Sequence, residues 1–243
     1  MRIYAGLKRD DWERWGQFTT YKDNLAGLLR RELCSHMRIY CSPLVDPYQP
    51  AEESQEVMPE ILHTIRNAPP AVFTIQTRGP LILRDLDLLR DIARCTSLRI
   101  SFSLTTDDDS VRRLYEPHCA SIEQRLQVIE QLRCAGLAIH ATLAPLLPCD
   151  PIRLMNLALE VTSEPVVGDP LHLRETKRHG ATTREQAFRI AQKHGHEQWF
   201  QSEFQAHAVE QMKERAAQAG RCFATGPEGF RCLTYSTNSD SKK

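Results

Sequence analysis

Residues that could bind a ligand follow four apolar runs of the sequence, at the points where predicted strands would end. Cys41 closes RIYC, Arg78 follows AVFTIQT, Ser103 lies near the end of LRISFSL, and Ala144 lies near the end of LAIHATLAP. In parallel α/β folds, ligands bind at the carboxyl ends of the strands. A cation, hydroxyls, a thiol and backbone groups at that edge suit a ligand with a carboxylate and a ribose. The structural alternative is that Ser, Thr and Pro after a strand are ordinary turn residues.

Thiols and imidazoles show no spacing that would bind a metal ion. The eight cysteines are scattered, and none forms a CxxC or CxxxC pair. The nine histidines include no HExxH, and His194 and His196 fall at the end of a predicted helix, where the dipole favours a cation. The sequence therefore predicts no metal ligands in this chain and no zinc hydrolase.

Three further charged residues, Arg112, Arg113 and Glu116, lie in the segment DDDSVRRLYE. Its acids suit the N-terminus of a helix, where the dipole favours negative charge. Arg113 and Glu116 are three residues apart, so we expect them to form an ion pair along the helix.

Strands and helices alternate along the first two thirds of the chain, at intervals of about 25 to 35 residues. This rhythm predicts a parallel sheet with right-handed crossovers, either an open sheet or a barrel. Ser121 and Gln124 have the spacing of a capping box, and Gly136 suits the end of the same helix. Pro59 lies in another predicted helix and is tolerated only near the first turn of that helix. The predicted strands are residues 38–42, 71–77, 98–104, 137–145 and the apolar stretch 161–167, and the predicted helices are residues 24–33, 54–66, 83–94, 121–136 and 151–160.

The pattern changes after Gly168. Residues 172–220 predict two helices and no strand, in which Thr182 and Glu185 cap the first helix and Gly195 ends it. We expect residues 169–232 to form a helical C-terminal extension. The polar tail, residues 233–243, has the composition of a disordered segment. The expected domains are therefore residues 1–168, the extension and the tail.

Composition limits the possible partners and the compartment. The chain has 243 residues with 31 basic and 31 acidic side chains, so its formal net charge is zero. Neutral charge weakens the case for a nucleic-acid partner, although a local basic groove stays possible. No run approaches the roughly 20 apolar residues of a membrane span, and the charged N-terminus does not resemble a secretory signal. We expect a cytoplasmic protein with free thiols and no membrane partner.

Five separated blocks and one dipeptide occur in a familiar order: DPYQPAE (46–52), QTRGPLILRDLDLL (76–89), SFSLTT (101–106), EP (116–117), the SIEQRL helix (121–136) and LAPLLP (143–148). This series resembles the spore photoproduct lyase-like branch of the radical S-adenosylmethionine superfamily, whose members are often labelled DNA repair photolyases. The resemblance extends from about residue 18 to residue 148 and is specific as an ordered set.

The resemblance implies a partial (β/α)6 barrel and a four-iron–four-sulfur (4Fe-4S) cluster that cleaves S-adenosylmethionine to a 5′-deoxyadenosyl radical. It implies a flavodoxin- or ferredoxin-like reductant and a substrate that could be nucleic acid. Arg78 corresponds to the cation near the methionine carboxylate, Ser103 to a residue near the ribose, and Ala144 to a backbone position near the adenine. Cys41 lies close to the position of a hydrogen-donating cysteine in the spore enzyme, but its surroundings differ, which favours a buried structural cysteine.

The cluster loop is where this sequence departs from that pattern. In the resembling proteins three cysteines in CxxxCxxC hold the cluster, and no such motif occurs here. We expect the chain to begin just past that loop, as part of a longer reading frame or as a separately used fragment, and to lack the first strand and cluster binding. An enzyme completed by upstream cysteines and a non-catalytic remnant or binding module both stay open. A missing first strand would expose RIYCS as an edge, and we expect poor solubility.

Overall fold

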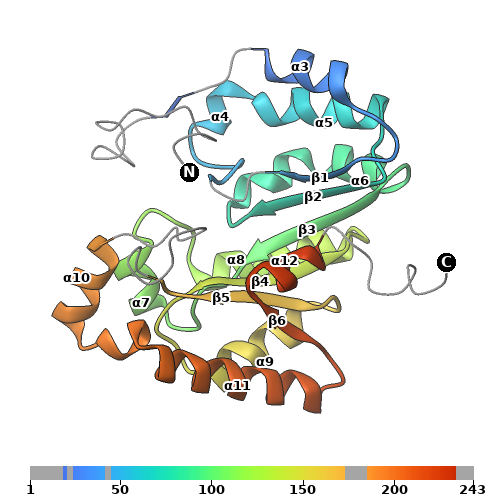
Figure 1. The fold of residues 1–243 in the computed structure, drawn as a ribbon. Coiled ribbons are helices and arrows are strands. Elements are labelled where there is room, and N and C mark those ends of the chain that lie inside the picture. Colours follow the sequence, from blue (N-terminus) through green and yellow to red (C-terminus); the bar gives the residue numbers. More distant parts are fainter. Residues whose placement is uncertain (1–18, 21–23, 42–44, 173–184, 234–243) are drawn as a thin grey trace.

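The computed structural model describes residues 19–20, 24–41, 45–172 and 185–233. Within these ranges, six parallel strands form one sheet in sequential order, β1-β2-β3-β4-β5-β6 (Figure 1). Each crossover therefore places the next strand beside the previous one, and the carboxyl ends of all strands share one edge. The strands are β1 (Arg38–Cys41), β2 (Val72–Thr77), β3 (Ser97–Ser103), β4 (Ile139–Leu146), β5 (Val166–Pro170) and β6 (Phe223–Thr225).

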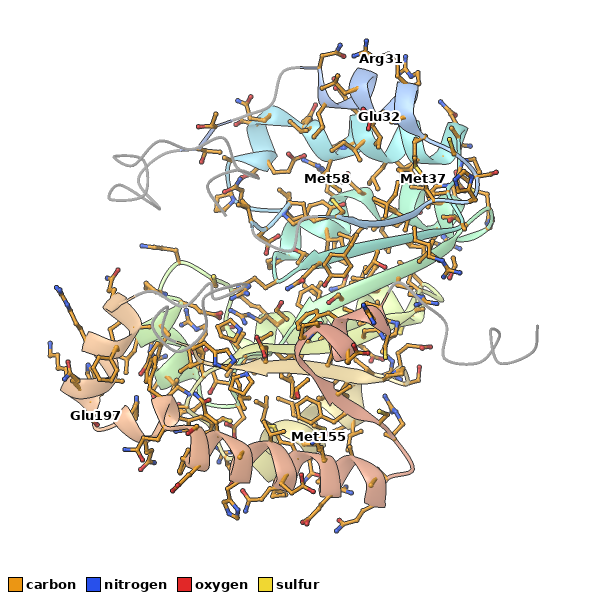
Figure 2. The ribbon with its side chains drawn as sticks, in the orientation of Figure 1. Arg31, Glu32, Met37, Met58, Met155 and Glu197 are labelled. Atoms are coloured by element: carbon orange, nitrogen blue, oxygen red, sulfur yellow. The ribbon has the colours of Figure 1, made fainter. Side chains whose placement is uncertain are left out.

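Helices connect the strands and pack around the sheet. Figure 1 shows α5 and α6 beside β1 and β2, α3 on the outer side of α5, and α9 and α11 at the opposite end of the molecule. Figure 2 labels buried Met58 on α5 and Met155 on α9, whereas Arg31 and Glu32 lie on the outer surface of α3. The helices are α3 (Leu25–Glu32), α4 (Glu52–Gln55), α5 (Val57–Asn67), η1 (Pro80–Asp85), α6 (Leu86–Ala93), α7 (Asp109–Tyr115), α8 (Ile122–Cys134), α9 (Pro151–Val161), α10 (Glu185–His194), η2 (Glu197–Phe200), α11 (Ser202–Gln218) and α12 (Gly226–Arg231).

The two faces of the sheet differ in polarity, because side chains alternate along each strand. One face carries apolar residues such as Phe73 and Phe102, which belong to one buried cluster with side chains from α5, α6, α8 and α9. The other face is polar although it is also buried. On it Ser101 and Thr142, from β3 and β4, share a hydrogen bond between their hydroxyl groups.

The C-terminal turn covers part of the polar face. The Thr74 hydroxyl donates a 2.7 Å hydrogen bond to the backbone oxygen of Leu233, and the Arg99 guanidinium donates a 2.9 Å hydrogen bond to the backbone oxygen of Cys232. In Figure 1, α12 lies in front of the sheet. These contacts leave the other end of the polar face, where the strands terminate, uncovered by this turn.

Local signals in the sequence are confirmed at several helix ends. Ser121 and Gln124 form a capping box, Gly136 has a φ of 80°, and Gly195 has a φ of 71° directly after α10. Pro59 falls in the first turn of α5, where its missing N–H costs no helical hydrogen bond. The capping role expected of Thr182 lies outside the described residues, as does the tail from residue 234 onward.

The predicted helix 54–66 is wrong at its start, because the helical path is interrupted between α4 and α5. Glu56 adopts a left-handed conformation, with a φ of 49°. The buried carboxylate of Glu52 then accepts hydrogen bonds from the backbone nitrogens of Val57 and Met58, at 3.2 Å and 2.8 Å. A side chain from α4 therefore caps α5 and satisfies the first backbone donors of that helix.

The α/β class with a parallel sheet is confirmed. A closed barrel is not shown, because in the described part of the chain β1 and β6 are the two edges of the sheet and do not pair with each other. β1 is an edge, as expected, and poor solubility stays a prediction. The extension 169–232 is not wholly helical as expected, since β6 lies within it and pairs with β5. Among the described helices, none is long and apolar enough to cross a membrane.

Candidate functional site

Asp46 attaches the loop after β1 to the carboxyl end of β2. Its carboxylate accepts hydrogen bonds from the Tyr48 backbone nitrogen at 2.9 Å, the Thr77 hydroxyl at 2.6 Å and the Arg78 backbone nitrogen at 2.8 Å. Gly79 makes the close approach possible, because a Cβ atom there would lie 2.4 Å from the Tyr48 backbone oxygen. The segments DPYQP and TRGP therefore form one rigid wall.

A cavity of about 740 Å³ lies beside this wall, at the carboxyl ends of β2 and β3. Its size falls within the range of small-molecule sites in proteins. The cavity lies where parallel α/β folds bind ligands. The polar residues in its lining include Gln49, Gln76, Arg78, Ser103, His118 and Cys119.

Ser103 supplies a polar group to the cavity that the protein itself does not satisfy. Its side chain is buried at 1% exposure, and its hydroxyl has no hydrogen-bond partner among the described residues. Buried hydroxyl groups in native proteins are nearly always paired, since an unpaired one costs about 1 to 3 kcal/mol. A hydroxyl of this kind in the lining of a cavity is suited to bind a polar group of a ligand.

Arg78 supplies a cation to the cavity and is held by Glu116. The Arg78 guanidinium donates to one carboxylate oxygen of Glu116, and the Arg125 guanidinium donates to the other at 2.5 Å. The predicted pair of Arg113 with Glu116 is wrong, because Arg113 instead pairs with Asp109 at 2.9 Å. Glu116 turns inward because α7 ends at Tyr115 and the chain leaves the helical path.

Charge favours the ionised forms of Glu116 and Arg78. Burial of Glu116 opposes its ionisation, but attraction to Arg78 and Arg125 outweighs burial and lowers the pKa of this carboxyl group. Burial of Arg78 likewise acts to lower its pKa, and the adjacent Glu116 carboxylate reverses the effect and raises it. Two guanidinium groups and one carboxylate leave a single net positive charge.

The structure brings Arg78 and Ser103 together and leaves the other two predicted residues outside the lining. Neither Cys41 nor Ala144 is among the residues that line the cavity in the described part of the chain. Burial, with a smaller effect of Asp46, raises the pKa of the Cys41 thiol to about 12, which disfavours a reactive thiolate there. Ala144 is half-buried on β4.

The sequence placed DPYQP at a strand end, but sequence reasoning missed the hydrogen-bond partners of Asp46, Glu116 and Arg125, and the presence of Cys119 in the cavity. Asp46, Glu116 and Arg125 lie in the recognised blocks, but a block does not show which side chain its residue will meet. Cys119 follows the EP dipeptide by two positions and had no signal of its own. Burial raises the pKa of this thiol, so it also favours the protonated form.

The part of the chain that the structure describes contains no set of side chains suited to bind a metal ion. No group of three or more His, Cys, Asp or Glu side chains there could hold a metal ion. A four-iron–four-sulfur cluster needs thiolate ligands, so the described residues do not fit this group.

No protein-family model and no solved structure matches the chain. An uncharacterized protein of Mycobacterium tuberculosis (strain H37Rv) is 33% identical over 131 residues, which cover 52% of this chain and 38% of that protein. An uncharacterized protein of Mycobacterium bovis matches to the same extent. An uncharacterized protein of Acidianus two-tailed virus is 26% identical over 183 residues, which cover 71% of this chain and 52% of the viral protein. The matched part therefore spans between 38% and 52% of these relatives.

Proposed function

We propose that this chain is part of a radical S-adenosylmethionine protein of the spore photoproduct lyase-like type, and that its cavity binds S-adenosylmethionine. The observation that carries the proposal is the shared cavity of Arg78 and Ser103, which come from different strand ends. The resemblance assigns one of these residues to the methionine carboxylate and the other to the ribose. The sequential parallel sheet is consistent with the partial (β/α)6 barrel that the resemblance implies.

In this proposal the described residues bind and orient the cofactor. Arg78 binds the carboxylate, the Ser103 hydroxyl bonds to the ribose, and the wall held by Asp46 excludes water from one side. A reduced 4Fe-4S cluster, if a longer chain held one beside the cavity, would supply the electron for reductive cleavage of S-adenosylmethionine. The described residues do not supply the thiolates for that cluster, so we assign no radical step to them.

The second candidate is a binding module that holds the same kind of ligand without redox chemistry. The described residues contain no set of thiolates that could hold a cluster, which favours this second candidate. Only the enzyme would need a flavodoxin- or ferredoxin-like reductant. A nucleic-acid substrate stays a prediction for the enzyme.

Calorimetric titration of S-adenosylmethionine into the 243-residue chain tests the proposed binding. We expect Arg78→Gln to weaken binding by about tenfold to a hundredfold, the value of a charge-assisted hydrogen bond. Arg113→Gln is the matched control, since its side chain is 64% exposed and pairs only on the surface of α7. Absence of binding to the wild-type chain would refute the proposal.

Anaerobic reconstitution with iron and sulfide separates the two candidates. A stoichiometric cluster with its visible absorption would exclude the binding module. Binding of S-adenosylmethionine without a cluster would favour it for this chain. Reconstitution of a longer chain with an in-frame CxxxCxxC would then test the enzyme.

A further inference from the structure

Two recognised blocks have no role in the proposed function. These are the dipeptide EP, which contains Glu116, and the SIEQRL helix, which contains Arg125. In the structure Glu116 and Arg125 meet each other and Arg78. Thr105, from the SFSLTT block, joins them by donating a 3.1 Å hydrogen bond to Glu116.

Glu116 and Arg125 are both buried, and their geometry leaves them little freedom. The Arg125 side chain is 1% exposed and also donates to the backbone oxygens of Ala120 and Ser103, at 3.1 Å and 3.4 Å. The Glu116 side chain is 8% exposed, and both of its carboxylate oxygens are occupied. Arg125 therefore fixes Glu116, and Glu116 fixes Arg78, whose backbone is already held by Asp46.

Only one of these three charged side chains lines the cavity. Arg78 is 24% exposed and belongs to the lining, whereas Glu116 and Arg125 lie behind it. The wall thus presents one guanidinium in a fixed orientation. The three side chains together carry a net charge of one, and the Asp46 carboxylate in the same wall offsets it. A planar guanidinium so fixed is complementary to a single carboxylate. Arg84 also lines the cavity, but its guanidinium is paired with Glu52 and Asp85. A second negative charge on the ligand would therefore have to compete with these acids or face Glu116.

We propose that Glu116 is a positioning residue that orients Arg78 and makes the cavity selective for a monoanionic carboxylate over a dianionic phosphate. The choice of S-adenosylmethionine as the carboxylate ligand rests on the proposed function. The orientation of Arg78 by Glu116 does not rest on it. The two parts can therefore fail separately.

Two variants separate the orientation of Arg78 from the charge. Glu116→Gln releases Arg78 and raises the local charge from one to two. The double variant Glu116→Gln with Arg125→Gln releases Arg78 but restores a charge of one. Glu123→Gln, at an exposed acid on α8, is the control.

The titrations use S-adenosylmethionine and adenosine 5′-monophosphate, which share adenine and ribose and differ in the 5′ substituent: one carries a carboxylate with cationic sulfonium and ammonium groups, the other a dianionic phosphate. We expect Glu116→Gln to weaken S-adenosylmethionine binding by about tenfold and to shift the preference towards the monophosphate by at least that factor. The double variant should weaken S-adenosylmethionine binding without the gain for the monophosphate. If the ratio of the affinities for S-adenosylmethionine and adenosine 5′-monophosphate were unchanged in Glu116→Gln, the proposed selectivity would be overturned.

Nuclear magnetic resonance of the arginine side chains tests the positioning without a ligand. We expect a slowly exchanging guanidinium signal of Arg78 in the wild-type chain, assigned by its loss in Arg78→Lys. The signal should disappear in the double variant, which contains no unpaired buried Arg125 and so retains the fold. In Glu116→Asp, which keeps a carboxylate, we expect the Arg78 guanidinium protons to exchange more slowly than in the double variant and faster than in the wild-type chain. A protected Arg78 signal that survives the loss of Glu116 would overturn the positioning role, whether or not S-adenosylmethionine binds.

Discussion

The carboxylate of Asp46 accepts a 2.8 Å hydrogen bond from the backbone nitrogen of Arg78, and this contact joins the first loop of the sheet to the second. The same carboxylate also binds the Thr77 hydroxyl and the Tyr48 backbone nitrogen. Arg78 is therefore held at two points, its backbone by Asp46 and its side chain by Glu116. The direction of the only arginine that we place in contact with a ligand depends on two acids from distant parts of the chain.

Replacement of Asp46 by alanine should lower both stability and affinity. Three donors lose a charged acceptor, and we expect a loss of about 2 to 4 kcal/mol in the free energy of unfolding, because a hydrogen bond to a charged group contributes roughly 1.5 to 3 kcal/mol. Urea denaturation of Asp46→Ala measures the loss. Asp87→Ala is the control, since that side chain is 98% exposed. Equal stability of the two variants would contradict the role of Asp46.

Replacement of Gly79 by alanine should open the wall. The added Cβ atom would lie 2.4 Å from the Tyr48 backbone oxygen, so the two loops must separate. We expect a cost of about 1 to 3 kcal/mol, the usual range for overpacking, together with weaker binding of S-adenosylmethionine. Thermal unfolding and calorimetry measure the two effects. Gly136→Ala is an informative comparison. Alanine at this position would be strained by the φ of 80°, but its Cβ atom would have no other atom within 4 Å, so we expect binding to be unchanged.

Much of the fold was predictable because the signals were local. The capping box at Ser121 and the apolar run of β2 depend on residues that are neighbours in the sequence. β6 was missed because a strand of three residues carries too little periodicity to be recognised. The break at Glu56 was missed because the cap comes from Glu52, through a turn that helical periodicity does not reveal.

The site was predictable in its location and only partly in its contacts. Strand ends indicated Arg78 and Ser103, and both residues line one cavity, whereas their role in binding stays a prediction. The partner of Glu116 was wrong because helical spacing assumes that the helix continues. α7 ends at Tyr115, so Glu116 leaves the surface and meets residues that are distant in sequence. Partnerships of this kind depend on tertiary packing, which no local pattern encodes.

Replacement of Ser103 by alanine should separate stability from binding. The wild-type hydroxyl is buried without a partner, so its removal abolishes a desolvation cost, and we expect the free energy of unfolding to stay equal or rise by about 1 kcal/mol. Affinity for S-adenosylmethionine should fall by about fivefold to tenfold, because the ribose loses a hydrogen bond. Denaturation and calorimetry on the same preparation give both values. Unchanged affinity would mean that Ser103 does not contact the ligand.

Acidification should remove the contribution of Glu116 to stability. Its pKa is lowered in the folded protein, against about 4.3 in an unfolded chain, so the contribution is complete above the unfolded value. As pH falls below about 4.3 towards the folded pKa, the unfolded state takes up the proton first and the contribution is lost. At neutral pH we expect Glu116→Gln to be about 3 kcal/mol less stable than the wild-type chain, since Arg125 is left buried and unpaired.

The measurement is the difference in free energy of unfolding between the wild-type chain and Glu116→Gln, from urea denaturation at a series of pH values. Other acids with lowered pKa values, Asp108 and Asp109 among them, occur in both chains and cancel in the difference. The difference should be constant from pH 7 to about pH 5 and should narrow below about pH 4. A difference that is independent of pH would mean that Glu116 is not ionised in the fold, and that its contact with Arg78 and Arg125 is not an ion pair.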